Sequence, residues 1–343
     1  NKHLSPVQSS MMSCHASQCG FCTPGFVMAL TGMVEKKLAC KATTISEKDA
    51  RNATTGNLCR CTGYKDILSA ATSIDLKRCD PITRRYLTPG IATDLKKVLK
   101  TPIEARGSEF EVYAPVTLAQ ARALTKKGAA LLAAGTDLGV VHNKRKLRLT
   151  RVMSLHLLQD LYALSQKSGR IKVGARATLS ELRRFTSKSV PEFSRFLDLF
   201  ASPQIKNVAT LIGNVANGSP IADTPPFLLV SDAVVHLCGP RGTRKVAIEK
   251  FYLGYRKTAL KAGEFITAIE FEAPGDTLAL YKVSQRKDLD ISTVNAAFRV
   301  ETKNGRILRA RFALGGVAAT SIRLTQTEKA LKGKTLDEAR AGA

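Results

Sequence analysis

Four of the eight cysteines in this 343-residue chain form two close pairs. Cys19 and Cys22 lie in QCGFCTPG, and Cys59 and Cys61 lie in LCRCTGY. Cysteines this close in sequence can direct both sulfurs toward one point, which a metal centre needs and a disulfide does not. Four thiolates bind either structural zinc or an iron–sulfur cluster, and the spacing alone does not choose between the two.

Two further stretches indicate a large bound ligand. AAGTDLG, residues 133–139, follows the apolar run GAALL, and a glycine turn at a strand end can present backbone N–H groups to a pyrophosphate. NVATLIGNVANGSPIADTPP, residues 207–226, mixes apolar residues with glycine, asparagine and serine, which lets a backbone approach a ligand closely. The sequence contains no G-x-G-x-x-G, so a Rossmann dinucleotide fold is not supported.

The elements around the cysteines are predicted to be helices. Residues 6–38 predict two helices separated by the first cysteine pair, with Thr23 as the cap of the second. A third is predicted from Ser46, which forms a capping-box pattern with Asp49, and a fourth follows the second cysteine pair at residues 64–74. Four short helices would form a small bundle with the cysteines in its loops.

The pattern changes after residue 75. Residues 76–107 contain scattered prolines without a sustained period, which is typical of a linker. Residues 110–139 predict strand, helix, strand and a glycine turn, and residues 170–185 repeat the step from strand to helix. From about residue 276, three strand-like runs and a KNG turn predict a smaller antiparallel unit.

Composition sets limits on the function. There are 53 Lys and Arg against 28 Asp and Glu, a net charge of +25, which favours acidic partners. The one dense basic run, residues 142–151, has no interleaved aromatics, which disfavours nucleic acid. No apolar run approaches the ~18 to 20 residues of a membrane span. The unpaired cysteines favour a reducing cytoplasm and are predicted to be small buried residues: Cys14, Cys40, Cys79 and Cys238.

QCGFCTPGFVMAL followed by GNLCRCTGY resembles the helical 2Fe-2S domain of the molybdenum hydroxylases, the xanthine dehydrogenase and aldehyde oxidase family. The resemblance implies that Cys19, Cys22, Cys59 and Cys61 bind a 2Fe-2S cluster. It also implies that Gln18 and Cys61 face the molybdopterin cofactor of a partner subunit.

The two glycine-bearing stretches resemble the flavin domain of the same family, whose FAD is held by a similar pair of loops. Residues 281–292, YKVSQRKDLDIS, resemble the segment where a nicotinamide docks, although a charged strand end would look the same. At Ile212 the family carries glycine, so isoleucine would strain the second loop if the position required a positive φ. The flavin contacts that the resemblance implies are Leu131, Leu132, Ala133, Ala134, Gly135, Thr136, Asp137, Leu138, Phe200, Thr210, Leu211, Ile212, Gly213, Asn214, Asp223, Ile266 and Lys282.

The resemblance implies a multidomain α+β chain truncated at both ends, since the family carries a ferredoxin-like domain upstream and more sequence downstream. Residues 1–75 would be the four-helix 2Fe-2S domain and residues 76–107 a linker. Residues 108–275 would be a two-subdomain α+β FAD-binding domain of the PCMH type. Residues 276–343 would be an incomplete antiparallel α+β domain similar to the C-terminal domain of CO dehydrogenase flavoprotein.

The implied function is that of the small subunit of a xanthine dehydrogenase in purine catabolism. Electrons would pass from a molybdopterin-binding large subunit through 2Fe-2S to FAD and on to NAD, in a cytoplasmic heterotetramer or larger assembly, and no catalytic base would lie in this chain. An aldehyde or N-heterocycle hydroxylase, such as one acting on nicotinate, would use similar electron-transfer parts. A zinc-stapled, basic nucleic-acid-binding protein would explain the charge and the thiolates, but not the two glycine-bearing stretches.

Overall fold

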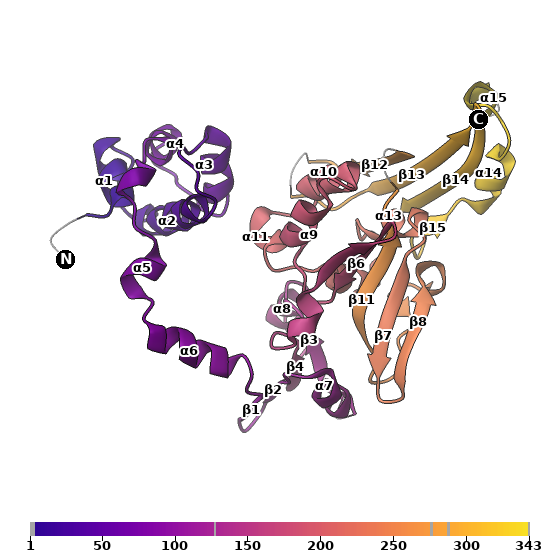
Figure 1. The fold of residues 1–343 in the computed structure, drawn as a ribbon, viewed down its shortest axis with the longest axis horizontal. Coiled ribbons are helices and arrows are strands. Elements are labelled where there is room, and N and C mark those ends of the chain that lie inside the picture. The colour runs from indigo at the N-terminus through magenta and orange to yellow at the C-terminus, as the bar shows by residue number, and fades with distance from the viewer. Residues whose placement is uncertain (1–3, 127, 275–276, 287–288, 342–343) are drawn as a thin grey trace. The chain divides into compact units, whose positions relative to one another are not determined.

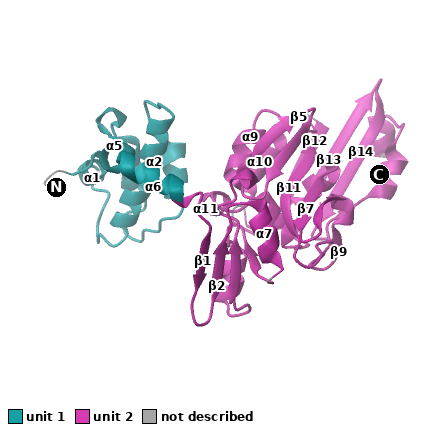
Figure 2. Cartoon of the chain, turned by 60° about the horizontal axis from the view of Figure 1, so that its bottom comes forward, with its two compact units in different colours: residues 1–97 teal, residues 98–343 magenta. Residues whose placement is uncertain are grey.

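A computed structural model describes residues 4–126, 128–274, 277–286 and 289–341. The chain forms two compact units, residues 1–97 and residues 98–343, shown in teal and magenta (Figure 2). Each unit has its own hydrophobic core. No helix in the described ranges is both long and apolar enough to cross a membrane.

The core of unit 1 is enclosed mainly by its first four helices (Figure 1). The predicted Ser46–Asp49 capping box is present at the third helix. Thr23 does not cap the second helix, because it is that helix's first residue and its hydroxyl bonds to Ser17 Oγ at 2.7 Å. Phe26 and Leu30 are fully buried in the core. The helices are α1 (Pro6–Ser13), α2 (Thr23–Ala39), α3 (Glu47–Thr54) and α4 (Lys65–Thr72).

The stretch predicted as a linker carries short elements of its own. They are η1 (Leu76–Arg78), α5 (Ile82–Tyr86), α6 (Pro89–Val98) and β1 (Ile103–Arg106). The helices α5 and α6 have no buried residue, as expected of a connecting segment. The strand β1 pairs antiparallel with β2, so residues 103–106 belong to the first sheet of unit 2.

The first sheet of unit 2 has the order β1-β2-β4-β3, with β2 and β3 parallel to β4. The predicted succession of strand, helix, strand and glycine turn is confirmed here. Thr117 and Gln120 form a capping box at the connecting helix α7. The elements are β2 (Glu111–Ala114), α7 (Leu118–Thr125), β3 (Ala130–Leu132), α8 (Leu138–Asn143) and β4 (Arg151–Ser154).

The second sheet is antiparallel throughout, in the order β5-β6-β11-β7-β8. Its strands are β5 (Leu164–Lys167), β6 (Arg170–Gly174), β7 (Val234–Gly239), β8 (Gly242–Ala247) and β11 (Phe265–Glu272). The predicted step from strand to helix at residues 170–185 is confirmed by β6 and the helix after it. The remaining elements between β4 and β11 lie outside this sheet: η2 (Gln159–Tyr162), α9 (Leu179–Thr186), α10 (Pro191–Leu199), α11 (Pro203–Lys206), α12 (Leu211–Ala216), α13 (Pro225–Val230), η3 (Ile248–Lys250), β9 (Tyr252–Gly254) and β10 (Lys257–Thr258).

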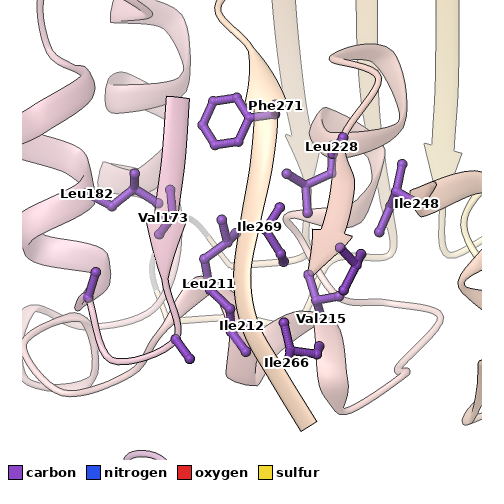
Figure 3. Packing of buried hydrophobic residues seen from close by; sticks show 14 of the residues in the cluster. Val173, Leu182, Leu211, Ile212, Val215, Leu228, Ile248, Ile266, Ile269 and Phe271 are labelled. Atoms are coloured by element: carbon purple, nitrogen blue, oxygen red, sulfur yellow. The ribbon is translucent and has the colours of Figure 1, made fainter. Parts of the chain in front are cut away.

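The main core lies between this sheet and the helices that cover it (Figure 3). Phe193 of α10 stacks on Phe227 of α13 with ring centroids 3.8 Å apart, and Phe271 of β11 meets Phe227 edge-on. These rings join two helices to the central strand. The helix α12 adds Leu211 and Val215 to the same core and so fixes the second glycine-bearing stretch on the sheet.

The third sheet, β12-β13-β14-β15, is the antiparallel unit predicted near the C-terminus. The long strands β13 and β14 meet at Asn304 and Gly305, both with positive φ, as the KNG turn predicted. Residues 275–276, where this unit was predicted to begin, lie outside the described residues. The elements are β12 (Leu278–Val283), β13 (Val294–Lys303), β14 (Arg306–Gly315), β15 (Ile322–Arg323), α14 (Thr325–Leu331) and α15 (Leu336–Ala341).

Candidate functional site

In unit 1 the two cysteine loops come together. Cys19 and Cys22 lie in the turn between α1 and α2. Gly20 in this turn has a φ of +82°, a backbone conformation that residues other than glycine rarely adopt. Cys59 and Cys61 lie in the turn before α4. Gln18, Cys19 and Cys61 are exposed, whereas Cys59 is buried. The loops therefore present sulfurs at the surface of the bundle and anchor them on its core.

The four sulfurs form two pairs. Cys19 and Cys61 have their sulfurs 3.5 Å apart, and the Cys22 thiol interacts with the Cys59 sulfur as a hydrogen-bond donor. Two thiolates about 2.3 Å from one tetrahedral metal lie roughly 3.8 Å apart, so the spacing of Cys19 and Cys61 is close to what one iron needs. No single-ion site with three or more Cys, His, Asp or Glu ligands occurs within the described ranges. Two pairs of thiolates fit a dinuclear cluster with two ligands on each iron.

Hydrogen bonds prepare one sulfur of each pair to carry negative charge. The Thr62 hydroxyl, followed by the N–H groups of Thr62 and Cys61, lowers the pKa of Cys59 to about 6. The Phe21 N–H lowers the pKa of Cys19. Burial raises the pKa of Cys22. The hydrogen bond between Cys61 and Cys19 raises the pKa of Cys61. Iron requires thiolates, so a lowered pKa at one sulfur of each pair favours binding.

The other cysteines do not belong to this site. All eight cysteines are free thiols. Cys238 is buried, as predicted, and burial raises its pKa. The prediction is wrong for Cys40, which is exposed at the end of α2, while Cys14 and Cys79 are half-buried.

Unit 2 contains a cavity of about 510 Å³ between its two glycine-bearing stretches. This volume lies within the range of cofactor sites. The cavity brings together most of the predicted flavin contacts: Leu131, Ala133, Ala134, Gly135, Thr136, Asp137, Leu138, Phe200, Thr210, Ile212, Gly213, Asn214 and Ile266. Leu132, Leu211, Asp223 and Lys282 are not part of its lining.

The first stretch offers backbone donors to the cavity. Gly135 turns the chain after β3 with a φ of +78°, and the helix α8 follows. The N–H groups of Gly135, Thr136 and Asp137 donate to no other residue that the structure describes. Successive N–H groups in such a turn form a concave site for an anion. This arrangement fits the pyrophosphate of a dinucleotide.

The second stretch is held firmly beside the first. The Thr210 hydroxyl accepts the Gly213 N–H at 2.9 Å and so caps α12. The Asn214 side-chain oxygen accepts the Thr224 hydroxyl at 2.6 Å. Asn217 donates to the Asp137 carboxylate at 3.4 Å, which joins the two stretches across the cavity. The contact between Asn217 and Asp137 thus links the two stretches that line the cavity.

Ile212 does not strain this stretch. It is the second residue of α12, so its backbone is helical and the expected positive φ is absent. Its side chain is buried among Leu211, Val215 and Ile266 (Figure 3) and also lines the cavity. The expectation of backbone strain is wrong because a helical position accepts any β-branched residue at small cost. What isoleucine changes is the width of the cavity.

Asp223 and Lys282 form a buried ion pair. Lys282 Nζ lies 2.8 Å from Asp223 Oδ2 and 2.9 Å from Ser292 Oγ, and their side chains are only 5% and 8% exposed for Lys282 and Asp223. The Ser292 hydroxyl and the Asn295 amide donate to Asp223 Oδ1 at 2.5 and 3.0 Å. This pair joins the segment before α13 to β12 and β13. Residues 287–288 of the predicted nicotinamide segment lie outside the described residues.

Arg176 is a residue that the sequence did not single out. Its side chain is nearly buried and donates to the carbonyl of Ala133, at the start of the first glycine turn, and to the Tyr162 oxygen at 3.4 Å. Its guanidinium also lies over the Tyr162 ring, 5.3 Å from the centroid. An arginine that fixes a carbonyl of the turn orients the N–H groups after it. Only its contacts across the fold reveal this role, because Arg176 lies 43 residues from Ala133.

Three family models match the chain in succession. A [2Fe-2S] binding domain matches residues 1–72, the FAD binding domain in molybdopterin dehydrogenase matches residues 108–273, and the CO dehydrogenase flavoprotein C-terminal domain matches residues 279–343. The cysteine site lies within the first match and the cavity within the second.

Named relatives agree with these models. Xanthine dehydrogenase 1 of Arabidopsis thaliana is 30% identical over an alignment that covers 96% of this chain and 29% of the relative. The chain thus spans about 29% of the length of that relative. The structure of reconstituted CO dehydrogenase from Oligotropha carboxidovorans is 30% identical, with a TM-score of 0.63, and covers 69% of this chain and 86% of that one. Quinoline 2-oxidoreductase from Pseudomonas putida 86 is 26% identical, also with a TM-score of 0.63, and covers 69% and 84%.

The chain belongs to the molybdenum hydroxylase family, of which it carries the 2Fe-2S-binding and FAD-binding domains. The predicted family, the multidomain α+β fold, and the 2Fe-2S cluster and FAD as cofactors are confirmed. The domain boundaries and the contacts of individual residues stay predictions.

Proposed function

We propose that this chain is the electron-transfer part of a xanthine dehydrogenase, which takes electrons from a molybdopterin-binding partner and delivers them to NAD. The observation that carries the proposal is that a 2Fe-2S module is followed by an FAD module in one chain. Nearly the whole of this chain, 96%, aligns with part of a xanthine dehydrogenase. The 2Fe-2S cluster supplies one-electron transfer when bound, and FAD supplies the step from single electrons to hydride.

In this function the cysteine loops hold the cluster at the edge of unit 1. Cys19 and Cys61 form one pair of ligands, and Cys22 and Cys59 form the other. The exposure of Gln18, Cys19 and Cys61 supports the predicted approach of the molybdopterin cofactor on this side. A short path between centres requires that little protein separate the ligands from the partner, and exposed ligands meet that requirement.

The cavity of unit 2 would hold FAD. The free N–H groups of the first stretch would bind the pyrophosphate, and the apolar walls, with Phe200 and Ile266, would surround the rings. Asp223 and Lys282 would act as a rigid support for β12 next to the predicted nicotinamide segment. The proposed setting is a heterotetramer or a larger assembly in the cytoplasm, where eight free thiols are stable.

A second candidate substrate class is the N-heterocycles other than purines, or aldehydes. The quinoline 2-oxidoreductase structure matches 69% of this chain with the same TM-score as the CO dehydrogenase structure, which supports a shared electron-transfer part for several substrates. Substrate choice in this family is a property of the partner, so the two candidates differ in the partner and agree on this chain.

The test is to purify the tagged chain together with its native partner and to measure iron, acid-labile sulfide, flavin and molybdenum. We expect all four, and we expect xanthine and NAD to give urate and NADH in equal amounts. Cys59→Ser should lose iron and NADH formation, whereas the matched control Cys40→Ser, at an exposed cysteine outside the pairs, should keep both. Activity on nicotinate or an aldehyde but not on xanthine would refute the substrate alone. A preparation without iron and sulfide would refute the whole proposal.

A further inference from the structure

Thr62 makes an unusual contact with one of the candidate cluster ligands. Its hydroxyl donates to Cys59 Sγ at 3.3 Å, and the N–H groups of Thr62 and Cys61 donate to the same sulfur at 3.5 and 3.4 Å. In the described part of the chain, no side-chain hydroxyl donates to the sulfurs of Cys19, Cys22 or Cys61. Cys59 therefore accepts more hydrogen bonds than the other three, and one of them comes from a replaceable side chain.

The turn around Thr62 holds this hydroxyl in one orientation. The Tyr64 N–H donates to Thr62 Oγ1 at 3.2 Å, which leaves the hydroxyl proton for the sulfur. The Cys59 N–H donates to the Tyr64 phenol oxygen at 3.0 Å and closes the loop. Gly63 and Tyr64 have φ values of +65° and +68°, a left-handed conformation that costs a non-glycine residue about 1 kcal/mol or more. The hydrogen bonds of the turn hold Thr62, Gly63 and Tyr64 in place in spite of this cost at Tyr64.

We propose that the Thr62 hydroxyl is a positioning group that raises the reduction potential of the 2Fe-2S cluster. The inference deepens the proposed function and rests on it, because it needs a cluster on Cys59. Reduction adds one electron to the cluster and needs no other reactant. The thiolate ligands therefore carry more negative charge in the reduced state. A hydrogen bond to a thiolate strengthens as the sulfur becomes more negative, and it therefore stabilises the reduced state more than the oxidised one.

The test compares three variants of the full chain with its partner bound. Thr62→Val removes the hydroxyl and keeps the branched shape, and Thr62→Ser keeps the hydroxyl. Thr31→Val is the matched control, because Thr31 lies in the same unit and its hydroxyl donates to the Val27 carbonyl at 2.7 Å and to no cysteine among the described residues. The readout is a redox titration followed by electron paramagnetic resonance, with iron and sulfide measured on the same samples.

We expect Thr62→Val to lower the equilibrium constant for one-electron reduction about tenfold, which is a shift of ~59 mV to more negative potential. Thr62→Ser and Thr31→Val should keep the wild-type potential. An unchanged potential in Thr62→Val, or an equal shift in Thr62→Ser, overturns the inference while the cluster itself, and so the proposed function, stands. If Thr62→Val does not hold the cluster, Thr62→Ala is titrated instead. Loss of the cluster in both, with Thr62→Ser intact, overturns the tuning role in favour of a structural one. Wild-type protein without iron and sulfide refutes the proposed function instead.

Discussion

The ion pair between Asp223 and Lys282 provides a sharp test of how unit 2 is held together. Both side chains are more than nine-tenths buried, and Asp223 also accepts hydrogen bonds from Ser292 and Asn295. Lys282→Met replaces the charged end by an apolar one of similar length and leaves Asp223 without its cation. An unpaired charge in such a place is destabilising by about 3–5 kcal/mol. Lys282→Met should lower the free energy of unfolding of unit 2 by this amount.

The double variant Asp223→Asn with Lys282→Met separates the pair from the loss of packing. Asparagine can still accept the Ser292 hydroxyl, and no unpaired charge remains, so the double variant should be more stable than Lys282→Met alone. The matched control is Arg183→Met, because the Arg183–Asp198 pair lies 3.1 Å apart but its side chains are 38% and 60% exposed. That exposed pair should contribute about 0–1 kcal/mol.

The assay is urea unfolding followed by far-ultraviolet circular dichroism, since the chain has no tryptophan to report by fluorescence. Flavin binding to each variant is measured in parallel. If Lys282→Met unfolds within about 1 kcal/mol of the wild type, the reasoning from burial is wrong. If that variant is stable and has lost its flavin, Lys282 is a cofactor contact and not a structural support.

Two further outcomes are expected in unit 2. Ile212→Ala should lower the free energy of unfolding by about 2–5 kcal/mol, because the side chain is buried in the main core, and it should also widen the cavity. A calorimetric melting curve measures the loss of stability. A variant as stable as the wild type would contradict the packing. The Arg244 guanidinium lowers the pKa of Glu264 to about 2, so this pair stabilises the fold above the usual carboxyl pKa and stops doing so as the pH falls toward 2. The difference in unfolding free energy between wild type and Arg244→Met should therefore be at its full value at pH 6 and shrink in acid. A difference that does not change with pH would contradict this reasoning.

Local patterns made the cysteine site predictable. Cys19 and Cys22, and likewise Cys59 and Cys61, are neighbours in sequence, and the helices around them have short-range signals such as the Ser46–Asp49 box. The KNG turn between β13 and β14 is predictable for the same reason, since its conformation depends on Asn304 and Gly305 themselves. The pairing of the sulfurs across loops is long-range, and the sequence left it open.

The cavity shows where local reasoning ends. Gly135 could be assigned to a turn because its neighbours demand one, but the groups that shape the turn come from distant positions, such as Arg176 on the Ala133 carbonyl and Asn217 on Asp137. A polar residue in an otherwise ordinary stretch carries no signal of a partner many residues away. The same limit explains Asp223 and Lys282, which the family pattern places at the flavin and which the fold joins to each other.

Ile212 shows the converse. Its residue type indicated a departure from the family pattern, but the sequence did not reveal its helical backbone conformation. A position occupied by glycine suggests a positive φ, yet glycine also occurs where a side chain would crowd a ligand. Replacing the glycine strains the backbone in the first case and reduces the space for the ligand in the second. The helical backbone of α12 rules out the first case. The second remains, since the Ile212 side chain lines the cavity beside Gly213, where an added Cβ would come within 3.2 Å of Thr210 Oγ1. The departure from the family pattern thus acts through the volume left for the cofactor and not through the fold of the loop that holds it.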